Sequence, residues 1–377
     1  MNDTLLWMMA LPVAIGVAVW FFTKDRVQNA WMPALVNGVV GALILVGVFY
    51  GSKGAATADT EIWNGMITAK ARDHGTYEKP YECRCRSVPD CTGTGKDRRC
   101  GTKRECDTCY ETRYTVNWNC TSTIGRWTIA SEDQSSRRVY DLPNPQRWSI
   151  IQPGDPVSKT HSYTNYVQAV PETLFKPSSE SLKAKFAALT PAYPLNVYDF
   201  YKLDRFLTPG YSTPDAAAWN LDISNMLREL GPKKQVNAIV VIAKTADPNY
   251  EYALRDAWEG ANKNDVVLVI GSAEWPKIDF VRVISWTKSE LFKVQLRDTI
   301  QELGTIQRAP IMSALQEQIG KNFERRKMRE FEYLETEIDP PTWLMILVSV
   351  ILLAAGGVTW AVLTDRFTRR RPLTRKW

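Results

Sequence analysis

Long apolar runs lie near both ends of the chain, at 5–22, 32–50 and 343–363. Each is close to the roughly 20 residues that an α-helix needs to cross the hydrocarbon core of a bilayer. None of them contains Asp, Glu, Lys, Arg or His, which argues against an ion or proton path through these helices. The pattern predicts three transmembrane helices, two of them forming an N-terminal hairpin.

The region from 51 to 170 has a different pattern, in which short runs rich in Tyr, Trp, Thr and Val alternate with turn residues. Such runs are typical of antiparallel strands. We expect strands at 61–70, 110–121, 126–130 and 162–169.

A proline-rich stretch from 171 to 235 follows, which we interpret as a connector packed against the regions on either side. It predicts a short helix over 179–189 and a longer one over 214–230. Pro214 stands at the start of the longer helix, and Gly231-Pro232 is expected to stop it.

From 236 onwards strand and helix patterns alternate. The β-branched runs at 236–243 and 265–271 predict strands buried on both faces, and 279–286 a more exposed third strand. Helices are expected over 250–262, 289–303 and 310–334. In the second helix, the apolar residues Leu291, Val294, Ile300 and Leu303 are expected on one side.

These patterns predict an α+β membrane protein with a β-rich, cysteine-containing part and an α/β sandwich between the membrane helices. The last part of the α/β region is expected to be a stalk helix that leads into the third membrane helix. The expected parts are 1–50, 51–170, 171–235, 236–340, 341–364 and 365–377.

The charges at the membrane flanks predict the orientation. The short loop 23–30 carries Lys24 and Arg26 against Asp25, and the C-terminal tail carries six basic residues against Asp365. Basic flanks stay cytoplasmic, so residues 51–341 and the N-terminus are expected to be extracytoplasmic, in a multi-pass protein of the inner membrane. Basic side chains beside a membrane also attract anionic lipid headgroups, which makes candidate headgroup ligands of Arg369, Arg370 and Arg371.

The overall charge does not indicate nucleic-acid binding. The chain carries +6 in total, and nearly all of this excess lies in the C-terminal tail. The remainder is close to neutral, whereas a nucleic-acid-binding domain presents a basic surface. We therefore expect the lipid bilayer, other copies of this chain and an envelope protein as partners, and no nucleic acid.

Part of the α/β region resembles the TPM domain of thylakoid-lumen and bacterial envelope proteins. The resemblance covers residues ~236–334 and is carried by IVVIAKT, EYALRDAW, KNDVVLVIGS and FVRVISW. It implies a small α/β sandwich with divalent-metal binding or phosphatase activity through carboxylates near two turns, which points to Asp265 and Asp279. The family's Asp-Asn-Gly is replaced here by Asn264-Asp265-Val266, and its glycine-rich run by residues 285–288.

The chain as a whole resembles uncharacterised membrane proteins of tailed bacteriophages. The cysteine-rich segment, the stretch at 152–175 and the flanking membrane helices carry this likeness. It implies the inner membrane of an infected bacterium as the location and implies no activity.

All seven cysteines lie between Cys83 and Cys120. Two close pairs, Cys83/Cys85 and Cys106/Cys109, flank a polar hairpin that has little to bury, so a metal or covalent staple is expected. The four thiolates suit a structural zinc site. Disulfides suit an extracytoplasmic domain equally well, with Cys91–Cys100 as a further bridge within the hairpin and one cysteine left over.

The sequence provides little evidence for catalysis. Its two histidines, His74 and His161, stand in no catalytic motif, and no phosphate-binding loop is present. The leading hypothesis is therefore a membrane-anchored structural or interaction protein that forms homo-oligomers. The alternatives are a TPM-type metal-dependent envelope phosphatase, and a multimeric pore or envelope-remodelling complex.

Overall fold

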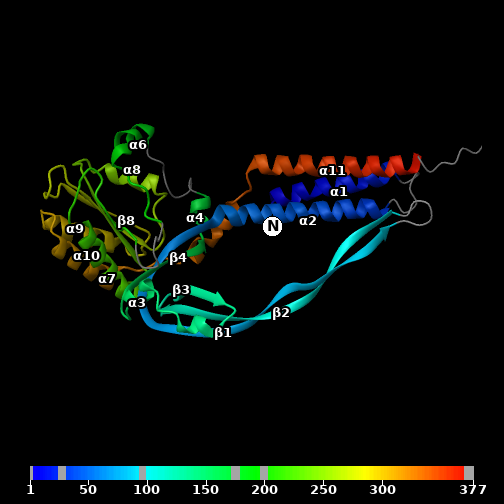
Figure 1. The fold of residues 1–377 in the computed structure, drawn as a ribbon. Helices are drawn as coiled ribbons and strands as arrows, with labels where there is room; N and C mark the ends of the chain where they lie inside the picture. Colours follow the sequence, from blue (N-terminus) through cyan, green and yellow to red (C-terminus); the bar gives the residue numbers. More distant parts are fainter. Residues whose placement is uncertain (1–2, 24–30, 93–98, 171–178, 196–202, 369–377) are drawn as a thin grey trace, which may run out of the picture.

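The structure is a computed structural model that describes residues 3–23, 31–92, 99–170, 179–195 and 203–368. It is an α+β protein with two four-stranded sheets and a separate bundle of long helices (Figure 1). We call the sheet of residues 58–170 the head, and the α/β unit of residues 179–337 the base.

The bundle consists of α1 (Asp3–Thr23), α2 (Trp31–Thr57) and α11 (Thr342–Thr368). Two stretches are long and apolar enough to cross a membrane, Leu35–Thr57 and Thr342–Val362. Leu45, Phe49 and Leu352 pack between the helices, while large apolar side chains on their outer sides are exposed. A helix that is apolar on all sides suits a lipid environment.

Contacts within the bundle fix the direction of each helix. An added Cβ at Gly41 would lie 2.9 Å from Pro12 and 3.6 Å from Leu352, and one at Gly356 would lie 2.6 Å from Ile15. The Thr359 hydroxyl lies 3.4 Å from the Asn37 side chain. α1 and α11 therefore run antiparallel to α2. The C-terminal ends of α1 and α11 and the N-terminal end of α2 lie together, at the end of the bundle that faces away from the base. Arg369, Arg370 and Arg371 lie outside the described residues.

The head is an antiparallel sheet of order β3-β2-β1-β4. Its strands are β1 (Ala58–Thr92), β2 (Arg99–Ser122), β3 (Gly125–Gln134) and β4 (Pro156–Thr164). Short elements follow the strands: η2 (Arg137–Asp141), α3 (Gln146–Ile150) and α4 (Tyr166–Ala169). The core of the head contains Ile67, Val116, Trp118, Cys120 and Val157.

The strands β1 and β2 continue far beyond the head sheet. β4 pairs with β1 as far as Met66, and β3 pairs with β2 as far as Tyr114. Beyond these points β1 and β2 pair only with each other, as far as Thr92 and Arg99. We call residues 77–92 and 99–113 the arm. Figure 1 shows it curving away from the head as a two-stranded ribbon.

The base sheet has the order β5-β6-β7-β8, from Phe206–Leu207, Asn237–Ala243, Asp265–Gly271 and Phe280–Ser285. β5, β6 and β7 are parallel and β8 is antiparallel. One face is covered by α7 (Ala216–Lys234), α9 (Glu290–Glu302) and α10 (Arg308–Asn322). The other is covered by α6 (Glu180–Phe186), η3 (Ala187–Leu189) and α8 (Tyr250–Ala257).

Four helix predictions for the connector and the base need correction. The helix expected over 250–262 ends at Ala257. α7 runs through Pro232 to Lys234 and so does not stop at Gly231-Pro232. In α9 the buried side chains are Phe292, Leu296 and Ile300, while Leu291 is 63% exposed. The predicted helix over 310–334 ends at Asn322, and a 3₁₀ segment, η4 (Met328–Glu337), follows it.

The break after α10 has a clear physical reason. Phe323 is extended and fully packed in the base core, and Arg325 forms an isolated bridge with Thr287. The chain between the two helical segments therefore lies against the base, where Arg325 reaches the head.

Candidate functional site

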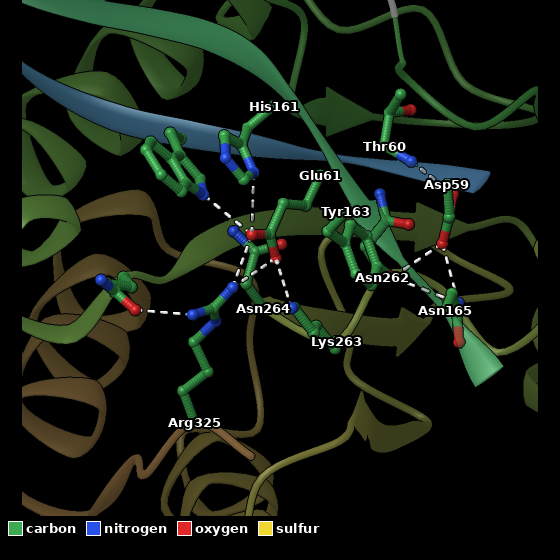
Figure 2. Close-up of polar contacts among 12 residues, drawn as sticks. Asp59, Thr60, Glu61, His161, Tyr163, Asn165, Asn262, Lys263, Asn264 and Arg325 are labelled. Atoms are coloured by element: carbon green, nitrogen blue, oxygen red, sulfur yellow. Dashed lines mark hydrogen bonds and ion pairs between the residues drawn. The ribbon is translucent and has the colours of Figure 1, made fainter. Parts of the chain in front are cut away.

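Buried polar side chains gather where the head meets the base (Figure 2). The head supplies residues from the start of β1 and from β4. The base supplies the first residues of β6 and β7, together with the segment after α10. This junction is the main concentration of buried charge in the described part of the chain.

Glu61 lies at the centre of the junction, with its side chain 1% exposed. The Nη2 atom of Arg325 donates to both carboxylate oxygens, at 2.5 and 2.7 Å. The indole nitrogen of Trp63 donates to Oε1 at 2.8 Å, and Lys263 Nζ lies 4.0 Å from Oε2. A buried charge is tolerated when it is paired and hydrogen-bonded, and the Glu61 carboxylate meets both conditions.

Two more basic groups adjoin this carboxylate. Burial lowers the pKa of His161 and so favours its neutral imidazole, whose ring stacks on Trp63 with the two ring centres 3.6 Å apart. Burial also lowers the pKa of Lys263, whose ammonium lies 3.9 Å from the centre of the Tyr163 ring. The negative charge of Glu61 acts in the opposite direction: it raises the pKa of both groups and so favours their charged forms.

A second set of polar contacts links the two sheets through Arg205, which is 1% exposed. Its guanidinium donates to Asn64 Oδ1 (2.5 Å) and Ser158 Oγ (2.6 Å) of the head and to Asn237 Oδ1 (3.0 Å) of the base. Asn264 Nδ2 adds a direct bond to the β1 carbonyl of Ile62 at 2.8 Å.

Asp265 extends this network into the base. Its carboxylate accepts from Asn237 Nδ2 (2.9 Å), from the Tyr193 hydroxyl (2.7 Å) and from the Asn262 backbone N–H (2.9 Å). Burial raises the pKa of Asp265 to about 6, and the three donors only partly oppose this shift. The carboxyl is fully buried and saturated with donors, so it is a structural acid.

Beside Asp265 lies a small cavity of about 190 Å³. Its walls include Asp59, Tyr193 and the turn after α8, where Glu259 and Ala261 have positive φ. Asp59 accepts from the Tyr163 hydroxyl and from Asn165 Nδ2, at 2.7 and 2.8 Å. Gln168 Nε2 donates to Glu259 at 2.8 Å. Both acidic side chains are therefore engaged within the chain.

The structure does not bring Asp265 and Asp279 together. Asp265 begins β7, whereas the Asp279 backbone N–H bonds to Gly271 at the other end of that strand. Six strand steps separate these ends by about 20 Å. Asp279 accepts from Ala273 N–H (2.7 Å) and lies 3.1 Å from Lys277 Nζ. Each carboxylate thus has its own partners, and a shared ion is not supported.

The four cysteines expected to form either a zinc site or disulfides are paired as disulfides in the arm. The bridges are Cys83–Cys109 and Cys85–Cys106, with a third at Cys91–Cys100. The leftover thiol is Cys120, buried in the head, where burial raises its pKa. Among described residues, one group of potential metal ligands converges, Glu82, Cys85 and Cys106. Because Cys85 and Cys106 are bonded to each other, zinc would require them to be reduced.

Sequence reasoning missed Glu61, Arg205 and Arg325, although one signal for Glu61 was available. Glu61 begins the predicted strand 61–70 and shares a face of it with Trp63, and a charge on a buried face needs a partner. Nothing in the sequence indicates that the partner is 264 residues away.

No family model, curated protein or solved structure matches this chain. The resemblances to TPM domains and to bacteriophage membrane proteins therefore stay predictions.

Proposed function

We propose that the protein is a membrane-anchored structural and interaction protein that forms a homo-oligomer and presents the head and base outside the bacterial inner membrane. In this arrangement α1, α2 and α11 cross the bilayer, and the N-terminus lies on the same side as the base. The C-terminal tail lies in the cytoplasm.

The arm is the observation that carries the proposal. An isolated two-stranded hairpin is marginally stable in water, yet this one continues for about 15 residues per strand beyond the last residue paired with β3. Three disulfides hold its strands together, so it remains extended without a core. Its tyrosines Tyr77, Tyr81 and Tyr110 are 44–66% exposed, and exposed aromatic rings of this kind suit protein contacts.

The junction supports the same function. Its buried charges are paired with one another between head and base, which fixes the direction in which the arm leaves the molecule. Lys53 of α2 also lies 3.5 Å from Glu335 of η4 and ties the bundle to the base. These contacts suit a rigid head and base that hold the arm in a fixed position, where it can bind another copy.

Shortening the arm tests this proposal. Glu78 pairs with Thr112, whose hydroxyl donates to the Glu78 carboxylate at 2.7 Å. Residues 79–111 can therefore be replaced by Asn-Gly, which favours a two-residue hairpin turn. Native mass in mild detergent is expected to show a multi-copy particle for the full chain and a smaller species for the shortened chain.

The unfolding temperature of the shortened chain serves as the control, since the head and base do not depend on the arm for their cores. A full-length chain that is monomeric in mild detergent would overturn the proposal. An unchanged particle after shortening would remove the arm as the contact element.

A further inference from the structure

The arm and the helix bundle extend from the base in the same general direction and to a similar distance. Figure 1 shows both extending on the same side of the base, and the arm reaching the level of the far ends of α1 and α2. The arm makes no extensive contact with the bundle among the described residues. If the helices cross a bilayer, the arm stands at the depth of that bilayer without cover from its own chain.

The length of the arm matches this depth. Fifteen residue steps separate Tyr77 from Thr92, and at about 3.4 Å per residue they span about 50 Å. A bilayer is about 40–45 Å thick including its headgroup regions. The arm is therefore long enough to pass from one aqueous side of a membrane to the other.

Lipid cannot surround this ribbon. Both of its outer edges carry backbone groups without a neighbouring strand, and open sheet edges exposed to lipid do not occur in the hydrocarbon region. Such an edge is tolerated at membrane depth only inside protein or against a water-filled space. Its side chains do not form the outward apolar band of a membrane barrel either, as Glu78, Arg84 and Arg86 show.

Charge is distributed unevenly along the arm. The half nearer the head carries four acidic and two basic residues, and the outer half carries two acidic and five basic residues. Copies that share one orientation would place like-charged halves beside each other. Repulsion between like charges keeps such arms apart, with water and counter-ions between them.

Resting on the membrane-anchored oligomer proposed above, we infer that the arms of several copies line a water-filled passage through the membrane, surrounded by the helices of the same copies. Hydrophilic solutes are the class of molecule that such a passage admits. Pro80, Pro89 and the register shift between Cys83 and Arg86 disfavour edge-to-edge pairing, so each arm contacts the surrounding helices of neighbouring copies and not another arm.

Single introduced thiols test this inference in the full-length protein. Six native cysteines are bonded and Cys120 is buried, so Ser87→Cys in the exposed outer arm adds the one readily accessible thiol among the described residues. Ser181→Cys is the matched control, because Ser181 is an exposed serine on α6 of the base. Thr102→Cys on the opposite strand of the arm gives an independent position.

The readout is efflux of a small anionic dye from vesicles that contain each purified variant. Efflux is expected from all variants, and a bulky membrane-impermeant thiol reagent should slow it several-fold at positions 87 and 102 but not at 181. A multi-copy particle that leaves vesicles tight would overturn the passage while the oligomer stands. Equal efflux after modification at all three positions would also overturn it, and a monomer would remove both proposals.

Discussion

The guanidinium of Arg325 donates hydrogen bonds to the carboxylate of Glu61 across the junction between head and base. One nitrogen, Nη2, donates to both oxygens, and Nη1 donates to the side chain of Gln235 at 2.6 Å. Glu61 belongs to the first strand of the head, while Arg325 follows the last helix of the base core. This contact therefore joins the start of the head to the end of the base.

Replacing Glu61 by Gln should destabilise the junction strongly. The change leaves Arg325 and Lys263 buried without a counter-charge, and breaking a buried ion pair costs about 3–5 kcal/mol. Urea unfolding of the full chain in detergent measures this loss. Glu180→Gln, which removes an exposed pair with Lys183, is the control and should cost less than about 1 kcal/mol. Equal losses in the two variants would contradict the central role of Glu61.

Asp265 should make stability depend on pH in an unusual direction. Its pKa is raised from 3.8 to about 6, so the folded protein holds this proton more tightly than the unfolded chain does. The stabilisation is complete below pH 4 and is lost as pH rises through about 6, a change of about 3 kcal/mol. The advantage of the native protein over Asp265→Asn should therefore be larger at pH 4 than at pH 7.

Asp279 provides the opposite control for this measurement. The Ala273 N–H and Lys277 lower the pKa of Asp279. Its contribution is present above the unfolded pKa and is lost as pH falls, so Asp279→Asn should matter more at pH 7 than at pH 4. The same pH slope for both variants would contradict this assignment.

Thiol titration should distinguish disulfides from zinc in the arm. Unfolded in denaturant without reductant, the protein should show one thiol, from Cys120, and after reduction all seven. No zinc should accompany the purified protein. Five thiols with one bound zinc would instead identify Cys83, Cys85, Cys106 and Cys109 as a metal site beside the Cys91–Cys100 bridge.

Gly231 should tolerate no side chain, because α7 meets the head there. A Cβ on Gly231 would lie 2.5 Å from the carbonyl oxygen of Asn64, so Gly231→Ala should destabilise the protein by about 1–3 kcal/mol. Gly320 in α10 has its nearest neighbour at 3.9 Å, and Gly320→Ala should be neutral or stabilising by up to about 1 kcal/mol. Thermal unfolding compares the two. An unchanged unfolding temperature for Gly231→Ala would show that the backbone at the junction can shift to make room for a methyl group.

The base strands could be predicted from sequence because burial on both faces leaves a direct mark. The runs 236–243 and 265–271 correspond closely to β6 and β7, and every residue of both strands is buried. The face of α9 could not be predicted, because Leu291 and Phe292 are both apolar and the packing of α9 against β8 and α10 decides between them.

The sequence predicted a stapled hairpin at the cysteines, but the length of the arm and the contacts of the junction were beyond local reasoning, for different physical reasons. The arm is polar on both faces, so no hydrophobic alternation indicates that its strands continue to Thr92 and Arg99. The junction depends on contacts such as that of Arg205 with Asn64, between residues 141 positions apart. Periodicity reports which residues are buried and does not report which distant residues meet.

The absence of a linker between α2 and β1 has a mechanical consequence. α2 ends at Thr57 and β1 begins at Ala58, and the same strand passes Glu61 and continues into the arm. α2 and the arm are therefore the two ends of one uninterrupted segment of chain, which the Glu61–Arg325 contact holds to the base between them. With α2 spanning a bilayer as proposed, we expect a tilt of a few degrees in α2, such as a change in bilayer thickness produces, to move the distal end of the arm, about 50 Å away, by several ångströms.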